Sequence, residues 1–115
     1  MKILIVEDDD GNRLLTYLEL SEEKSWDIFT ASNGQEAITL FEKEHPDIVT
    51  LDIDLPDING STLMREMKKN RPEVPIIILT GYDRHKDVSE ADAYILKSLS
   101  CGEELRKAIK KLLGR

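Results

Sequence analysis

The sequence predicts an α/β fold, a doubly wound five-stranded parallel sheet with helices on both faces. Short, unbroken apolar runs at residues 3–6, 48–51 and 76–79 are typical of strands that are buried on both faces of a parallel sheet. Segments with helical periodicity alternate with these runs, which implies right-handed crossovers. The length of 115 residues, 40% of them apolar, suits a single domain with one core.

Each element follows from a local pattern. Weaker strands at residues 26–31 and 94–96 complete the five. Helices are predicted where apolar residues recur at helical spacing, and we interpret these stripes as buried faces. In chain order they are Leu14, Leu15 and Leu18; Ala37, Ile38, Leu40 and Phe41; Leu63, Met64 and Met67; and Leu105, Ile109, Leu112 and Leu113. Capping boxes, Asn33 with Glu36 and Ser100 with Glu103, predict the starts of the second and last helices.

The crossover GYDRHKDVSEADA, from Gly81 to Ala93, is short. A helix that retraces a strand of about 17 Å needs roughly 11 residues at about 1.5 Å each, which leaves almost none for two loops. We therefore expect mostly loop here, with the fourth crossover helix shortened or absent.

Composition excludes several classes of protein. The 23 acidic and 16 basic residues give a net charge of -7, which disfavours direct binding to nucleic acid. The apolar runs are far below the roughly 18 residues of a membrane span, so we expect a cytoplasmic protein with no membrane contact. The single cysteine and the two distant histidines exclude an internal disulfide and a zinc-site spacing.

Chemically active side chains follow the predicted strands. In a doubly wound sheet the functional crevice lies beyond the carboxyl ends of the strands. The residues found there are Glu7 and Asp8, Asp52, Thr80 and Lys97. Clustered carboxylates repel one another unless a cation neutralises them, and oxygen ligands suit a hard ion such as Mg²⁺. The pattern therefore predicts a divalent-cation site, with Asp9 and Asp10 facing solvent and Arg13 close enough to offset charge.

Four motifs resemble those of the CheY-like receiver domains of two-component response regulators. They are KILIVEDD at residues 2–9, TLDIDLPDING at 50–60, ILTG at 78–81 and AYILK at 93–97, and their order and spacing match over essentially the whole chain. The resemblance implies a flavodoxin-like strand order, 2-1-3-4-5, and a single receiver domain spanning residues 1–115.

The resemblance also implies a role for each site residue. Asp52 would be phosphorylated, and Glu7, Asp8, Asp52 and the backbone carbonyl of Asp54 would hold Mg²⁺. Lys97 would bind the phosphoryl group. Thr80 would be the switch hydroxyl, with Tyr94 as its aromatic partner. Asp54 and Tyr82 occupy positions that tune the lifetime of the phosphate in the family.

The implied function is that of a phosphoacceptor signalling module. It would take a phosphoryl group from a histidine kinase or phosphotransfer protein and then control a downstream protein target. It would catalyse only its own phosphorylation and dephosphorylation, and it would be a monomer or weak dimer. The first helix would dock the kinase, and its leucines suit either the core or that contact. No output domain follows, so the chain would be a stand-alone receiver or a fragment of a longer regulator.

Two features depart from the family. Ser98 follows Lys97, where the family usually has proline after a cis bond, and a non-proline cis bond costs about 2.5 to 4 kcal/mol. We expect either a trans bond with a shifted loop or a strained cis bond. The short crossover falls where the family has its fourth helix, which puts output through that face in doubt.

Two other functions compete with this interpretation. Asp52-Ile53-Asp54 copies the Asp-x-Asp motif of haloacid dehalogenase-like phosphatases. The residues that should follow the motif are missing, however, and the chain is short for that fold. A degenerate receiver that binds a partner without phosphate is the second alternative, and the complete acidic set argues against it.

Overall fold

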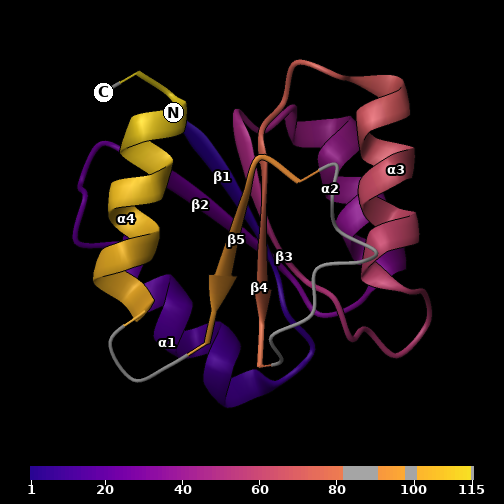
Figure 1. Ribbon diagram of the computed structural model, residues 1–115, viewed down its shortest axis with the longest axis horizontal. Coiled ribbons are helices and arrows are strands. Elements are labelled where there is room, and N and C mark those ends of the chain that lie inside the picture. The colour runs from indigo at the N-terminus through magenta and orange to yellow at the C-terminus, as the bar shows by residue number, and fades with distance from the viewer. Residues whose placement is uncertain (82–90, 98–100, 115) are drawn as a thin grey trace.

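The computed structural model describes residues 1–81, 91–97 and 101–114. The elements in chain order are β1 (Lys2–Val6), α1 (Asp10–Leu20), β2 (Asp27–Ala31), α2 (Gly34–Glu44), β3 (Ile48–Asp52), α3 (Gly60–Asn70), β4 (Ile76–Thr80), β5 (Ala93–Leu96) and α4 (Cys101–Leu112). The strands form one parallel sheet in the order β2-β1-β3-β4-β5 (Figure 1). This confirms the predicted fold class and strand order.

The helices form two layers, one on each face of the sheet. Helices α1 and α4 cover one face, and α2 and α3 cover the other (Figure 1). The unbroken apolar runs β3 and β4 are buried along their whole length, as expected for central strands with helices on both sides. None of the helices in the described ranges is long and apolar enough to span a membrane.

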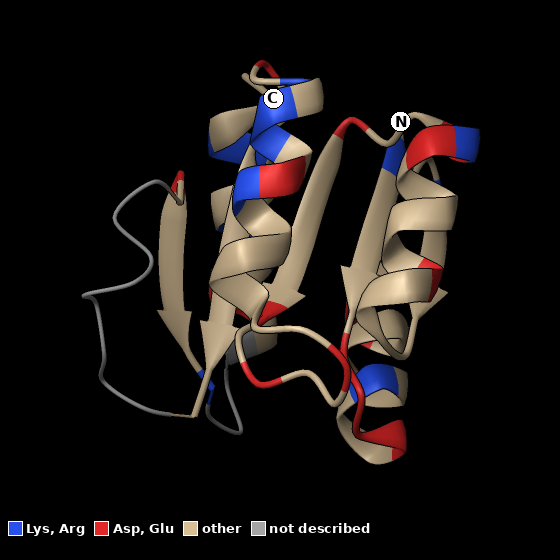
Figure 2. Ribbon diagram, turned by 90° about the vertical axis from the view of Figure 1, so that its right-hand side faces the viewer, with Lys and Arg blue, Asp and Glu red and all other residues tan. Residues whose placement is uncertain are grey.

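Strand register aligns the residues of the site. Val6 at the end of β1 lies beside Leu51, Asp52 lies beside Leu79, and Thr80 lies beside Leu96. The carboxyl ends of the four neighbouring strands therefore reach one edge of the sheet. Figure 2 shows acidic positions in the loops beyond the arrowheads at that edge.

Polar side chains begin the first three helices. Asp9, Asn33 and Asn59 each accept a backbone N–H bond from the first turn of α1, α2 and α3. The second helix starts where the capping box predicts, but Glu36 accepts from the backbone N–H of Ser32 and not from that of Asn33. The second predicted box begins at Ser100, which lies outside the described residues.

The leucine stripe of α1 does not form a buried face. Leu14, Leu15 and Leu18 are 56%, 65% and 52% exposed, so the interpretation of this stripe as core was wrong, and the alternative of an exposed docking contact stays a prediction. The less exposed positions of this helix include Arg13, Thr16 and Leu20, which are also three and four residues apart. Helical periodicity thus predicted the helix correctly but not its buried face, because residues on both faces recur at the same spacing.

The predictions for the fourth crossover cannot be compared with the structure. Residues 82–90 and 98–100 lie outside the described ranges. These include Tyr82, the shortened crossover helix and the bond between Lys97 and Ser98. Those expectations stay predictions.

Candidate metal centre

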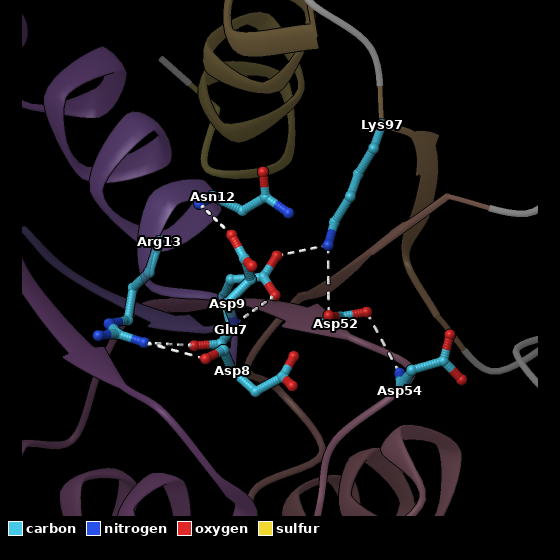
Figure 3. Close-up of polar contacts among 8 residues, drawn as sticks. All are labelled: Glu7, Asp8, Asp9, Asn12, Arg13, Asp52, Asp54 and Lys97. Carbon is cyan, nitrogen blue, oxygen red and sulfur yellow. Dashed lines mark hydrogen bonds and ion pairs between the residues drawn. The ribbon is translucent and has the colours of Figure 1, made fainter.

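Three carboxylates meet beyond the ends of β1 and β3. Glu7 and Asp8 follow β1, Asp52 ends β3, and one oxygen of each lies within 4.8 Å of the others (Figure 3). Glu7 and Asp52 are buried, at 4% and 6% exposure, whereas Asp8 is exposed at the mouth of the group. The structure thus brings together the three side chains predicted to hold a metal.

Lys97 enters the same group from the end of β5. Its ammonium forms an ion pair with Glu7 and donates to Asp52 Oδ2 at 3.2 Å (Figure 3). The backbone N–H of Lys97 donates to the carbonyl of Thr80 at 2.7 Å, which extends the pairing of β5 with β4 by one residue. Strand pairing therefore fixes where the cation enters the acidic group.

Burial and crowding perturb the ionisation of the group. The pKa of Glu7 is raised to about 7, mainly by burial and also by the neighbouring Asp52, while Lys97 acts in the opposite direction. Burial tends to lower the pKa of Lys97, but its bond to Glu7 and the charge of Asp52 outweigh burial, so that pKa is raised. One ammonium among three carboxylates leaves an excess of negative charge. A donor set made only of oxygen fits a hard divalent cation such as Mg²⁺.

The loop between β3 and α3, residues 53–59, forms the other side of the group. The backbone N–H of Asp54 donates to Asp52 Oδ1 at 3.2 Å (Figure 3), and that of Gly60 donates to the carbonyl of Ile53 at 2.8 Å. A Cβ on Gly60 would lie 2.5 Å from Ile53 Cα, so only glycine allows this close approach. The loop and Asp8 line an open cavity of about 510 Å³ beside the carboxylates.

Comparison with known proteins identifies this arrangement. The sequence model of the response regulator receiver domain matches residues 3–110. The chain belongs to the receiver domain family of two-component response regulators. This membership confirms the predicted resemblance and decides against the haloacid dehalogenase-like alternative.

The similar proteins include a transcriptional regulator and two solved receiver structures. The transcriptional regulatory protein TrcR of Mycobacterium tuberculosis is 36% identical, with a match covering 100% of this chain and 46% of TrcR. The response regulator TrrA of Thermotoga maritima, solved in complex with Mg²⁺-BeF, has a TM-score of 0.89 at 37% identity, covering 96% of this chain and 97% of that one. A complex of histidine kinase ThkA with TrrA gives a TM-score of 0.87 at 37% identity, covering 97% of each chain. This chain spans about half the length of the curated relatives it matches.

Thr80 and Tyr94 lie on neighbouring strands of this receiver domain, on the α2/α3 face of the sheet. Thr80 continues the row of Ile76 and Ile78, and Tyr94 pairs with Ile78 and packs against the same apolar core. Glu7 and Asp52 continue rows on the opposite face, behind Ile5 and Ile48. The two predicted switch residues therefore share a face that differs from that of the acidic group.

Asp9 and Arg13, at the start of α1, make structural contacts and are not part of the metal group. Asp9 accepts from the N–H of Asn12 and caps α1, and the group of three carboxylates does not include it. Arg13 donates to the backbone carbonyls of Glu7 at 3.1 Å and Asp8 at 3.4 Å (Figure 3). Arg13 thus holds the turn that carries the acidic pair, a contact that the sequence did not reveal.

Asp57 was also missed by sequence reasoning. It lies in the β3–α3 loop, yet its carboxylate accepts the backbone N–H bonds of Gly34 at 2.8 Å and Gln35 at 3.0 Å. The two partners lie more than twenty positions away. No local pattern around Asp57 could have indicated them.

Proposed function

We propose that this receiver domain accepts a phosphoryl group on Asp52, supported by Mg²⁺, and thereby switches the binding of a partner. The observation that carries the proposal is the surroundings of Asp52. Its carboxylate ends a buried central strand, contacts Lys97, and lies within 4.8 Å of the oxygens of Glu7 and Asp8. Carboxylates this close together repel one another, and a bound cation relieves that repulsion.

The residues provide for transfer between two anionic partners. A carboxylate oxygen of Asp52 attacks phosphorus, and the bond from phosphorus to the donor breaks, which leaves an acyl phosphate on Asp52. Glu7, Asp8, Asp52 and the carbonyl of Asp54 would hold Mg²⁺, whose charge offsets that of the phosphoryl oxygens. Lys97 would neutralise a further oxygen, since its ammonium already contacts Asp52.

The switch would involve Thr80 and Tyr94. New phosphoryl oxygens on Asp52 can accept a bond from the Thr80 hydroxyl, and Tyr94 would fill the space that the threonine leaves. The shared face and the neighbouring strands of the two residues support this role. Phosphorylation would shift the equilibrium only by its different affinity for the two arrangements.

The donor would be a histidine kinase or a phosphotransfer protein, docked on α1. The exposed Leu14, Leu15 and Leu18 form an apolar surface of the kind that accepts a partner helix. The similar receiver TrrA was solved with a histidine kinase, which supports this choice. Control of a target by a monomer or weak dimer, without direct contact to nucleic acid, fits the net charge of -7.

The catalysis that we propose is limited to this domain's own phosphorylation and dephosphorylation. The acidic group, Lys97 and Thr80 are all present among the described residues, which argues against a phosphate-independent receiver. We therefore propose a signalling role, without turnover of a separate substrate.

Acetyl phosphate with Mg²⁺ tests the proposal through intact mass. We expect one phosphoryl group per chain on the wild type, none on Asp52→Asn, and none after removal of metal by chelator. Asp9→Asn is the matched control, because asparagine still caps α1, and it should be labelled like the wild type. A folded wild type that binds Mg²⁺ without gaining mass would instead indicate a phosphate-independent binding module. Sustained hydrolysis of a generic phosphate ester would indicate a phosphatase.

A further inference from the structure

The β3–α3 loop is attached to a helix that contributes nothing to the metal centre. Both carboxylate oxygens of Asp57 accept N–H bonds from the first turn of α2, at Gly34 and Gln35. These N–H groups have no partner within their own helix, so the loop satisfies them. The helix supplies only Asn33 as a cap of its own, for the N–H of Glu36.

The contact is close as well as polar. A Cβ on Gly34 would lie 2.2 Å from Ile58 Cγ2 and 3.2 Å from Asp57 Oδ1. A Cβ atom at 2.2 Å from Ile58 Cγ2 would overlap with it, so the loop packs against the backbone of α2 at a position that only glycine can occupy without a shift. The Gly34 N–H also holds the pKa of Asp57 below its ordinary value, as expected for an anion at a helix N-terminus.

The same loop is closed on itself near the metal centre. A β-bridge joins Asp54 to Asn59, and Gly60 donates to the carbonyl of Ile53. The backbone of Asp54 therefore lies between two fixed points, the end of β3 and the α2 contact through Asp57. Asp57 lies between the two bridged residues, so its bonds to α2 restrain the same closed loop that carries Asp54.

We propose that Asp57 is a positioning residue for the metal centre. By fixing the β3–α3 loop to α2, it holds the backbone carbonyl of Asp54 where a divalent cation can bind it. The inference rests on the proposed function, because Asp54 is there a ligand of Mg²⁺. It adds α2, through Gly34, to the elements that determine the metal affinity of the domain.

Two variants separate positioning from simple helix capping. Asp57→Ala and Asn33→Ala each remove one cap from the same end of α2, so both should lower its stability. Only Asp57 belongs to the loop, so only its loss should weaken Mg²⁺ binding. We expect about a tenfold higher Kd for Mg²⁺ in Asp57→Ala, the lower end of what loss of an outer-sphere partner of a metal ligand costs. Asn33→Ala should bind like the wild type.

Two further variants test charge against geometry. Asp57→Glu keeps the charge but has a longer side chain, so it should also bind Mg²⁺ more weakly. Asp57→Asn loses the charge but keeps one acceptor oxygen, so it should restore part of the affinity. If Asp57→Glu binds like the wild type while Asp57→Asn is as weak as Asp57→Ala, the effect is electrostatic and the positioning role is overturned.

Amide hydrogen exchange without metal gives a readout that does not depend on the proposed function. The N–H of Gly60, bonded to Ile53, should exchange faster in Asp57→Ala than in Asn33→Ala at equal global stability. Equal exchange and equal Mg²⁺ affinity in the two variants would overturn the inference. If the wild type does not bind Mg²⁺ at all, the proposed function fails, and faster Gly60 exchange in Asp57→Ala would still support the attachment of the loop to α2.

Discussion

Helices α1 and α3 carry the same apolar pattern and use it in opposite ways. Leu14, Leu15 and Leu18 in α1 have the spacing of Leu63, Met64 and Met67 in α3, and both helices are 11 residues long. The α3 residues are buried against the sheet, whereas the α1 leucines point to solvent. A stripe of this spacing therefore predicts a helix but not which side of it meets the core.

Contacts outside the stripe determine the orientation of each helix. Gly60 lets the start of α3 approach the backbone of Ile53, which presses its apolar stripe onto the core. In α1, Arg13 reaches inward to the carbonyls of the turn that carries the acidic pair, and Leu20 is buried at the other end. The inner face of α1 thus contacts the turn that carries the acidic pair, and the leucines lie on the opposite, exposed face.

The largest effect expected from this comparison is on stability. Leu63→Ala should lower the free energy of unfolding by about 2 to 5 kcal/mol, because it leaves a cavity in a fully buried site. Urea unfolding measures it, with Leu14→Ala as the control at the equivalent position of α1. Equal losses in the two variants would mean that the leucines of α1 are buried in solution.

A smaller effect of opposite sign is expected on the α1/α4 side of the sheet. The hydroxyl of Thr50 in β3 is fully buried and has no hydrogen-bond partner among the described residues. Thr50→Val should raise the free energy of unfolding by about 1 kcal/mol, since an unpaired buried hydroxyl costs roughly that much or more.

Thr39→Val is the matched control for Thr50. The hydroxyl of Thr39 is exposed and donates to the carbonyl of Gln35, so its loss should not stabilise the protein. A destabilised Thr50→Val would show that the hydroxyl of Thr50 is bonded in solution, for example to a buried water molecule. The buried polar groups on the α1/α4 side of the sheet would then be hydrogen-bonded, like those on the α2/α3 side.

Low pH should lower the stability of the α2/α3 side, because two carboxylates that cap backbone N–H groups there become protonated. The pKa of Asp57 is lowered by the N–H of Gly34, and that of Glu36 by Ser32. Because both pKa values are lower in the folded state, these groups stabilise it above their ordinary values of 3.8 and 4.5. That contribution is lost as the pH falls through the folded pKa values.

The acid effect should be modest, because both carboxylates are exposed. The free energy of unfolding should be measured between about pH 6 and about pH 3, a range that spans the ordinary pKa values of carboxylates. It should fall less steeply with decreasing pH in Asp57→Asn than in the wild type. Parallel curves for the two proteins would show that the Asp57 cap adds no pH-dependent stability.

Much of the fold and site could be predicted from the sequence because the signals are local. Apolar runs located the strands, and the acids directly after them located the carboxylate group, since parallel strands end at one edge. The contacts that the sequence did not predict either join residues far apart in the chain or depend on which face of a helix meets the core. Asp57 binds a helix start far along the chain, and the outward turn of Leu15 depends on what Arg13 contacts.

The exposed leucines of α1 should matter least for stability and most for a partner. Leu15→Ala should change the free energy of unfolding by no more than about 0.5 kcal/mol, because the side chain is 65% exposed. Phosphotransfer from a purified histidine kinase that labels the wild type should slow by about tenfold, the effect of losing roughly 1.4 kcal/mol at a docking contact. Labelling by acetyl phosphate, which needs no docking, should be unchanged.

Leu96→Ala is the control for this last experiment, because Leu96 is an exposed leucine on β5 and not on α1. It should leave both kinds of labelling at the wild-type rate. If Leu15→Ala and Leu96→Ala behave alike with the kinase, α1 is not the docking surface. If phosphotransfer from the kinase slows only in Leu15→Ala, the two stripes of equal spacing have different roles. The stripe in α3 then stabilises the core, and the stripe in α1 binds the phosphoryl donor.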